Sequence, residues 1–531
     1  MLTRRRLLGT TAITAAAAAG WVPRPAFAEE VLRIATMGEP KSLDPHFVSG
    51  TWENIIVGDA FMGLMTDDSK AVPIPGAAES FTVSDDGLVY TFKLRDHKWS
   101  DGTPVSAEDF VFAFRRIMDP KLAAEYASIL YPIKNAEAIN GGKEADLTKL
   151  GVKAVDDKTL EITLENPTGY FPELMTHYTS FPLPRHVVEK FGNDWVKPGN
   201  IVSNGPFRIV EWTPNAQVVA EKNPEFYDAA NVAVDRVIYY PDEDRNAVAK
   251  RFRAGEIDWV DDFASEQIDF FKKELPEETH IAPYIGVYYY VINNKRPPFD
   301  QPEVRRALSL AVDRDAITGK ILRTGEIPAY GVVPPGTGGW GDGYKPDWLS
   351  MDFKSRQDEA RKLLAAAGFG PDKPLKVELS YNTSENHKRI AVAVQAMWKA
   401  IGVQAELVNR EVKVHYDVLK ENQFDVARAA WVADYNDPQN FLYLLETRTG
   451  VQNYGRFSNP EFDALMMAQA KERDQATRID LMKQAERIAM TADAWIPIYY
   501  YVSKALVSTK LEGYEDNPKH THRSRWVSFK G

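Results

Sequence analysis

The stretch Phe424–Pro438, which reads FDVARAAWVADYNDP, is the most informative part of this chain. It begins as an apolar run that ends in turn residues, the pattern of a buried β-strand. Arg428 interrupts the run, and Asp434 stands where the run gives way to Tyr-Asn-Asp-Pro. A carboxylate at the end of a buried strand is costly to desolvate unless it meets a cation. Arg428 and Asp434 are therefore a structural ion pair or two solvated charges, or else Asp434 receives the ammonium group of a ligand.

The first 28 residues have the composition of an export signal. A basic segment, Arg4–Arg6, precedes an apolar stretch from Leu7 to Ala19, and Ala26-Phe27-Ala28 matches a small-x-small cleavage site. The apolar stretch is too short for a membrane-spanning helix. Thr3–Leu8 resembles the twin-arginine signature, although basic segments also begin ordinary Sec signals. The pattern predicts export to a periplasm, by the twin-arginine route, with cleavage after Ala28.

Composition narrows the classes of partner. The chain has no cysteine, so we expect no lipid anchor, no disulfide and no thiol nucleophile. Its formal charge is −11, and removing the signal removes only bases. An acidic chain argues against a nucleic-acid partner and gives no polybasic segment to hold it on anionic lipid. We therefore expect no direct membrane anchor.

Length and periodicity predict a multi-domain α/β protein, because the roughly 500 residues after the signal exceed one ordinary core. Val31–Ala35 and Leu88–Leu94 are predicted strands. One helix is expected after Ser106, which would cap it together with Asp109 in a capping box. Two more are expected over Ser355–Ala367, with Ser355 as the cap, and over Pro302–Ala316.

Two tyrosine triplets, Tyr288–Tyr290 and Tyr499–Tyr501, lie in β-prone runs about 210 residues apart. They are either buried strands whose tyrosine hydroxyls find partners in the core, or strands whose tyrosines face a ligand cleft.

Many segments of the chain, in order and spacing, resemble the family 5 extracellular solute-binding proteins, and within them the oligopeptide-binding proteins of peptide ABC importers. Besides Trp431–Asn436, the matching segments are Ser42–His46, Lys98–Val105, Asn204–Phe207, Gly255–Asp258, Tyr288–Asn294, Asn382–Lys388 and Pro497–Val502. The resemblance covers nearly the whole chain after residue 28.

The resemblance implies a periplasmic binding protein-like fold, with two lobes that close around a ligand cleft and a third, accessory domain. Its implied division is a discontinuous first lobe of residues 29–61, 186–286 and 502–531, an accessory domain of residues 62–185, and a third part of residues 287–501. The two tyrosine-rich strands would then be the crossovers between lobes, with Tyr289 and Tyr500 facing the cleft.

The resemblance also assigns roles to residues. Asp434 would bind the N-terminal ammonium of a short peptide, and Arg428 or His387 would meet its carboxylate. The peptide backbone would pair as a strand with Ala430, Trp431 and Val432 on one side and with the segment around Thr51 on the other. Tyr126 would also line the cleft. The implied partners are short peptides and the permease subunits of an ABC transporter with their cytoplasmic ATPases, served by a monomeric binding protein.

Two positions depart from the family pattern. Ser49 stands where related proteins carry Glu, and Leu419 where they carry Arg. Losing that arginine predicts weaker binding of dipeptides than of tri- or tetrapeptides.

Catalysis was the main alternative to binding. Gly336–Gly341 matches Gly-x-Gly-x-x-Gly but lacks the strand and helix that a dinucleotide site needs. Asp242-Glu243-Asp244 and Asp261-Asp262 offer paired carboxylates, which are more often a solvated acidic surface. We expect no enzyme activity, no cofactor and no metal. Within binding proteins, a murein peptide or another amine-bearing solute remains the alternative ligand, since Asp434 would suit these as well.

Overall fold

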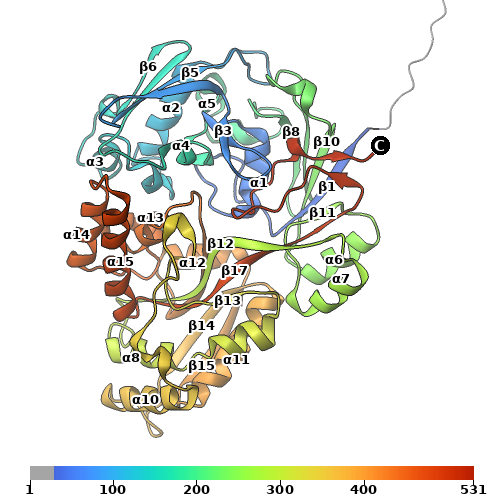
Figure 1. The fold of residues 1–531 in the computed structure, drawn as a ribbon. Coiled ribbons are helices and arrows are strands. Elements are labelled where there is room, and N and C mark those ends of the chain that lie inside the picture. The colour runs from blue at the N-terminus through green and yellow to red at the C-terminus, as the bar shows by residue number, and fades with distance from the viewer. Residues whose placement is uncertain (1–28) are drawn as a thin grey trace, which may run out of the picture.

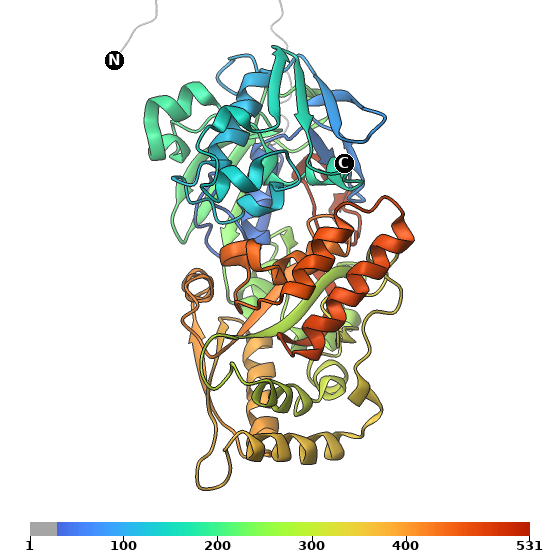
Figure 2. The ribbon, with the colours of Figure 1, turned by 90° about the vertical axis from the view of Figure 1, so that its left-hand side faces the viewer.

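The computed structural model describes residues 29–531, and the predicted export signal lies outside the described residues. Figure 1 shows two parts joined by two long strands, β12 (Thr279–Ile292) and β17 (Trp495–Val507). The upper part holds β1 (Val31–Thr36), which confirms the first predicted strand, and the lower part holds β14 (Lys376–Asn382). Seen from the side in Figure 2, the two parts are stacked one above the other.

One large sheet runs through both parts. Its strand order is β15-β14-β16-β12-β17-β11-β1-β10-β9-β8, and β13 pairs with β17 off this path. The remaining strands of this sheet are β8 (Phe207–Thr213), β9 (Gln217–Lys222), β10 (Arg236–Pro241), β11 (Trp259–Val260), β13 (Ile327–Pro328), β15 (Gln404–Arg410) and β16 (Val426–Val432). The apolar part of the stretch Phe424–Pro438 thus forms β16, next to β12.

The two long strands carry the tyrosine triplets, and their β-branched and aromatic residues favour extended backbone. β12 and β17 pair antiparallel, with register shifts between Pro283 and Val287 and between Tyr288 and Tyr289. Because successive side chains alternate between the two faces, each triplet contributes to two different cores. Tyr289 and Tyr500 belong to the larger hydrophobic core, and Tyr288 and Tyr499 to the core of the lower part.

A second, four-stranded antiparallel sheet lies in the upper part. Its order is β4-β5-β7-β6, formed by β4 (Ala78–Val83), β5 (Val89–Leu94), β6 (Val152–Asp156) and β7 (Thr159–Thr163). Helix α2 (Ala107–Met118) packs on it and begins as predicted. Asp109 Oδ2 accepts the Ser106 backbone N–H at 2.9 Å, which closes the expected capping box.

The other two predicted helices differ in detail. Helix α10 is Phe353–Ala366, and its cap is Asp352 rather than Ser355, because Asp352 Oδ1 accepts the Ser355 N–H at 2.9 Å. The helix predicted over 302–316 is shorter: α8 ends at Leu310 (Pro302–Leu310). A new cap, Asp313, then accepts the Ala316 N–H at 3.0 Å and starts the short helix α9 (Arg314–Ala316).

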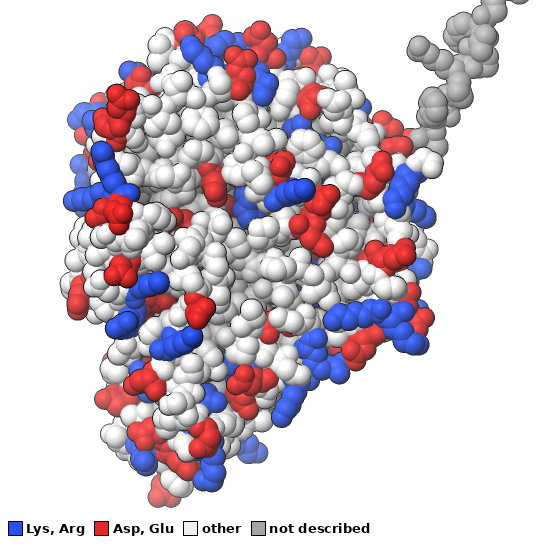
Figure 3. All heavy atoms as spheres, in the orientation of Figure 1, with Lys and Arg blue, Asp and Glu red and all other residues white. Residues whose placement is uncertain are grey.

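The surface carries both signs of charge. On the face in Figure 3, acidic and basic side chains are interspersed over the upper and lower parts. Within residues 29–531, no helix is long and apolar enough to cross a bilayer, and no group of three or more His, Asp or Glu side chains is arranged to hold a metal ion.

Candidate functional site

A cavity of about 200 Å³ lies beside β12, β16 and β17, and most of the predicted site residues line it. The lining residues from that set are Thr51, Tyr126, His387, Arg428, Ala430, Trp431, Val432 and Asp434. They come from segments of the chain that are hundreds of residues apart, so only the tertiary fold brings them together.

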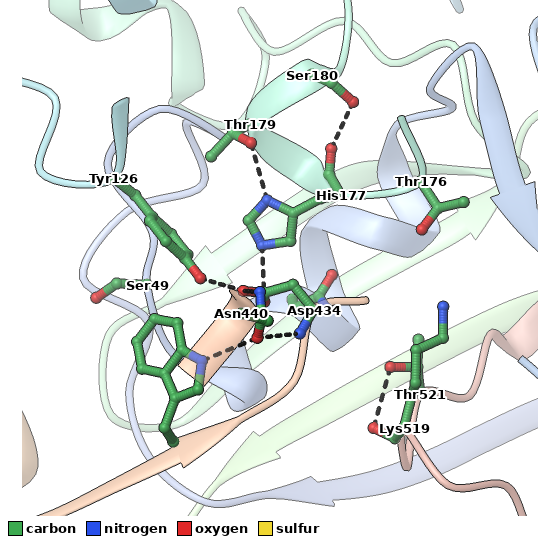
Figure 4. A network of polar contacts seen from close by, with 12 residues as sticks. Ser49, Tyr126, Thr176, His177, Thr179, Ser180, Asp434, Asn440, Lys519 and Thr521 are labelled. Carbon is green, nitrogen blue, oxygen red and sulfur yellow. Dashed lines mark hydrogen bonds and ion pairs between the residues drawn. The ribbon is translucent and has the colours of Figure 1, made fainter. Parts of the chain in front are cut away.

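Asp434 stands just beyond β16 in a network of polar groups, drawn in Figure 4. Tyr126 donates its hydroxyl hydrogen to Asp434 Oδ2, and Asn440 Nδ2 donates to the same oxygen at 3.3 Å. Asn440 Oδ1 in turn accepts the Asp434 backbone N–H at 3.1 Å and the Trp431 indole N–H at 3.0 Å. Asn440 therefore fixes both the carboxylate and the aromatic ring beside it.

The charge on Asp434 meets no permanent cation. Within the described chain, its one ion-pair neighbour is His177, whose Nε2 lies 3.2 Å from Asp434 Oδ1. His177 Nδ1 is held by Thr179 Oγ1 at 2.8 Å. Burial, and then the Asp434 charge, raise the pKa of Tyr126 well above its usual value, so this phenol stays a donor. The carboxylate is thus held in place and left without a full counter-charge, which suits a cationic ligand.

Arg428 does not pair with Asp434, so the two are not a structural ion pair. Arg428 is 6% exposed, and its guanidinium donates to neutral oxygens: Asn382 Oδ1 at 3.0 Å, Tyr416 OH at 3.3 Å and Tyr501 OH at 2.8 Å. It also lies over the ring of Tyr288, 4.9 Å from the centroid. A buried guanidinium without a carboxylate partner among residues 29–531 offers a site for an anionic group.

His387 lines the same cavity, at the start of α11 (Glu385–Lys399). Burial, and then the nearby Arg428 charge, hold the pKa of its imidazole well below the usual value. The ring is therefore neutral at physiological pH and can donate or accept one hydrogen bond to a ligand.

The backbone of β16 is open toward the cavity. β12 pairs with β16 along its length, but β14 pairs only with Val426 and Ala427. From Ala430 to Val432, β16 therefore has a strand on one side and the cavity on the other. An extended peptide can add to such an edge through main-chain hydrogen bonds.

The facing segment, Ser49–Trp52, leads into α1 (Thr51–Ala60). The buried side chain of Glu53 shapes it by accepting the backbone N–H groups of Ser49 and Gly50, each at 2.8 Å. Ser49 and Thr51 both line the cavity, whereas Leu419 is buried in α12 (Val412–Lys420) and does not.

Two of the predicted site residues lie away from the cavity. Tyr289 is buried against Trp495, with ring centroids 3.7 Å apart, and Tyr500 OH donates to the Gly331 carbonyl at 3.1 Å. Neither lines the cavity. The alternation of side chains along a strand accounts for these positions: Tyr499 and Tyr501 point to the cavity, so Tyr500 between them points to the opposite core.

Sequence reasoning missed several lining or supporting residues, among them Asn382, Tyr416, Tyr178, Asn440 and His177. Alternation along β17 could have identified Tyr501. No local pattern marks His177 or Asn440, whose role depends on where Asp434 lies in the fold.

A larger hollow of about 850 Å³ is lined by Tyr170, Tyr443 and residues of helices α14 (Pro460–Gln469) and α15 (Gln475–Thr491). None of the predicted site residues lines it. We therefore take the smaller cavity as the candidate site.

With this fold and cavity, the comparisons agree on one family. Residues 72–453 match the family model described as "Bacterial extracellular solute-binding proteins, family 5 Middle", and the chain belongs to this family of solute-binding proteins. It is 43% identical over 486 residues to the periplasmic oligopeptide-binding protein OppA of Escherichia coli, which covers 90% of this chain and 88% of that relative.

Solved structures give the same result for the fold. A complex of Haemophilus influenzae OppA with RPPGFSPFR has a TM-score of 0.92 at 36% identity, covering 95% of this chain and 99% of that one. The murein tripeptide-binding protein MppA of Escherichia coli also has a TM-score of 0.92, at 37% identity, covering 95% of this chain and 99% of that one. The two-lobed binding-protein fold expected from the sequence is thus confirmed.

A second structure of MppA is less similar to this protein. An unliganded open form of MppA has a TM-score of only 0.66, although it has the same identity and covers 95% of this chain and 98% of that one. The arrangement described for residues 29–531 therefore differs from that open form.

Proposed function

We propose that this protein is the substrate-binding component of an ABC importer, and that it captures short oligopeptides in the cavity beside Asp434. The observation that carries the proposal is a fixed carboxylate without a permanent counter-cation, placed at the end of an open strand edge. A peptide with a free amino terminus supplies both the cation and the backbone that these two features lack. The similarity to oligopeptide-binding relatives supports the same ligand class.

In this proposal each end of the peptide has its own partner. Asp434 binds the ammonium group, a charge-assisted bond worth about 1.5–3 kcal/mol. The backbone of the peptide forms hydrogen bonds with Ala430–Val432 on one side and with the segment at Thr51 on the other. Trp431 and Tyr126 pack against the first residue of the peptide. Arg428 and His387 receive the carboxylate of peptides of different length. Side chains enter the remaining space with bridging water, which accommodates different sequences at little cost.

We also propose where the protein works and with which partners. The protein works as a monomer in a periplasm, after cleavage behind Ala28, without a lipid anchor, and passes its ligand to membrane permease subunits driven by cytoplasmic ATPases. It catalyses no reaction and binds no nucleic acid. Residues 29–61, 186–286 and 502–531 form the first lobe, 62–185 the accessory domain, and 287–501 the part that closes on the first.

The test is thermal unfolding with a tri- or tetrapeptide and with its N-acetylated copy, on protein stripped of co-purified ligand. A ligand at about 100 times its dissociation constant adds about 2.7 kcal/mol to the free energy of unfolding. We expect this shift with the free peptide and none with the acetylated one. A protein that no free peptide stabilises does not have the proposed function.

Dipeptides should bind more weakly than tri- or tetrapeptides, because a hydrophobic residue, Leu419, occupies the position where related proteins carry a second arginine. Titration calorimetry with alanine peptides of two, three and four residues measures this directly. A dipeptide that binds as tightly as the tripeptide contradicts the prediction.

A murein peptide is the second candidate ligand, since MppA is 37% identical to this chain and a murein tripeptide also has a free amine. A competition titration of a murein tripeptide against an alanine tripeptide shows which of the two ligands the protein binds more tightly.

A further inference from the structure

The larger hollow of about 850 Å³, which we call the side groove, takes its lining from both parts of the molecule. The lining residues lie within 128–143 and 165–173 of the upper part and within 435–449 and 467–478 of the lower part. In Figure 1 the groove lies at the left, between α3 (Ala136–Asn140) above and α14 below. Its volume is that of pockets that hold small organic ligands, about 300–1,000 Å³.

The side groove is separate from the candidate site. Among residues 29–531, none lines both cavities. Their walls nevertheless touch, since Tyr443 of the groove packs edge-on against Trp431 of the candidate site, with ring centroids 5.9 Å apart. A ligand in the side groove would therefore lie near a bound peptide without competing with it.

The charges that line the groove are already paired or solvated. Arg448 lies between Glu137 Oε2, at 2.7 Å, and Glu446 Oε2, at 2.5 Å. Arg478 donates to both oxygens of Asp437, at 2.6 and 2.8 Å. The other charged lining residues are exposed or accept backbone N–H groups; they are Lys143, Glu165, Glu173, Lys471, Glu472 and Arg473. Within the described chain, an ionic ligand would thus meet no buried charge that lacks a partner.

Several buried polar atoms of the lining have no partner. Gln469, the last residue of α14, is 3% exposed, and its Oε1 makes no hydrogen bond to any described residue. The same holds for Glu446 Oε1 in the lower part and for Ser128 Oγ in the upper part. Leaving such atoms unpaired is costly, so a ligand or water must satisfy them. An amide, a carboxylate oxygen and a hydroxyl together call for a ligand that both donates and accepts hydrogen bonds.

The rest of the lining includes carbon surface from both parts. Tyr131 is half-buried and donates its hydroxyl hydrogen to Asn140 Oδ1 at 2.9 Å, so its ring offers mainly carbon to a ligand. Pro132 lies next to it in the chain, and Met467 of α14, which is 51% exposed, contributes from the lower part.

A saccharide has the matching chemistry. A sugar ring carries C–H groups on its faces and hydroxyls around its edge, and each hydroxyl both donates and accepts a hydrogen bond. It is neutral, so it needs no counter-charge. A purely apolar ligand would leave Gln469 and Glu446 unpaired, and an ion would lose its hydration without gaining a free partner charge.

We propose that the side groove is a second ligand site, and that it binds a neutral saccharide whose hydroxyls pair with Gln469, Glu446 and Ser128. The proposal goes beyond the peptide-binding function and does not depend on it. Because the lining comes from both parts, a bound saccharide also stabilises the arrangement of the two parts described here.

The test is titration of ligand-stripped protein with glucose, maltose and cellobiose, followed by ligand-observed NMR. Glucosamine and glucuronate serve as the cationic and anionic counterparts of glucose. We expect the neutral sugars to bind, and Gln469→Leu, which removes the amide at similar size, to weaken their binding about tenfold. Ser128→Ala removes a single oxygen and should weaken binding about two- to fivefold, so it carries the test if Gln469→Leu does not fold.

A matched control comes from the other end of the lower part. Gln404, the first residue of β15, is exposed and lines neither cavity. Gln404→Leu makes the same substitution and should bind the sugars like the wild type. Saturating alanine tripeptide should also leave the sugars bound, because the two cavities share no lining residue.

Three results overturn the proposal. If none of the neutral sugars binds, the groove holds only water. If glucosamine or glucuronate binds more tightly than glucose, the site is ionic. If the sugars bind equally to both variants, or alanine tripeptide displaces them, they bind elsewhere. A protein that binds no peptide would fail the proposed function alone, since the two variants decide this proposal without any peptide.

Discussion

At the scale of single residues, binding depends on a carboxylate whose counter-charge is missing. Asp434 is fixed by Tyr126 and Asn440, and His177 is its one ion-pair neighbour in the described chain. Neutral donors hold the side chain without cancelling its charge, so the full electrostatic attraction remains for a ligand. Arg428 is the complementary case, a buried cation held by neutral oxygens.

The first prediction concerns this carboxylate. Asp434→Asn keeps the shape of the side chain and removes the charge, so peptides with a free amine should bind about 10- to 100-fold more weakly and should lose most of their advantage over N-acetylated copies. Calorimetric titration measures both. Asp480→Asn, an exposed acid on α15 far along the chain, is the control and should bind like the wild type. A variant that binds the free peptide as tightly as the wild type would show that Asp434 does not hold the amine.

At the scale of elements, one helix carries a buried acid whose ionisation opposes folding. Glu486 of α15 is 2% exposed, and its Oε1 accepts the N–H groups of Val332 at 2.7 Å and Val333 at 3.0 Å. Burial raises the pKa of Glu486 to about 7, although these two N–H groups favour the charged form. Between the usual pKa and about 7, the folded protein keeps a proton that the unfolded chain releases, so the free energy of unfolding falls as the pH rises.

Glu486→Gln removes this pH dependence and keeps an acceptor for both N–H groups. Relative to this variant, the wild type should lose about 2–3 kcal/mol of stability between pH 4.5 and pH 8. Denaturant unfolding at several pH values measures the difference. Glu406→Gln, an exposed position on β15, is the control and should show the same pH dependence of stability as the wild type. Parallel curves for wild type and Glu486→Gln would contradict the prediction.

At the scale of the whole molecule, ion pairs join the two parts without touching the cavity. Glu125, which follows α2, binds Lys41 Nζ at 2.9 Å and also contacts Lys420 at the end of α12 in the lower part. On the same side, Arg448 Nη1 lies 2.7 Å from Glu137 Oε2. None of these residues lines the cavity, so they stabilise the arrangement of the two parts and make no contact with a ligand in the cavity.

Glu125→Gln should therefore weaken binding of every peptide by the same small factor, about two- to fivefold, because a partly exposed ion pair contributes up to about 1 kcal/mol. Affinities for a neutral, a basic and an acidic tetrapeptide, measured side by side, check this. Glu144→Gln, which breaks a pair with Lys149 within the upper part, is the control. Weaker binding of only one of the three peptides would mean that Glu125 senses the side chains of the ligand.

Sequence patterns alone were enough to predict the class of protein, the buried strand before Asp434, the capping box at Ser106 and some of the residues that line the cavity. These features are local patterns or ordered motifs, and they depend on residues close together in the chain. The sequence also identified Asp434 and Arg428 as charges that need an explanation, since a buried run rarely contains either.

Which faces of β12 and β17 meet the cavity is set by how the chain packs, and in the folded protein Tyr289 and Tyr500 lie in the core. The alternation of side chains fixes that Tyr499 and Tyr501 share a face, but not which face is hollow. The same holds for His177 and Asn440. Their neighbours come from segments far apart in the chain, and the charge balance around Asp434 exists only once those segments are packed together.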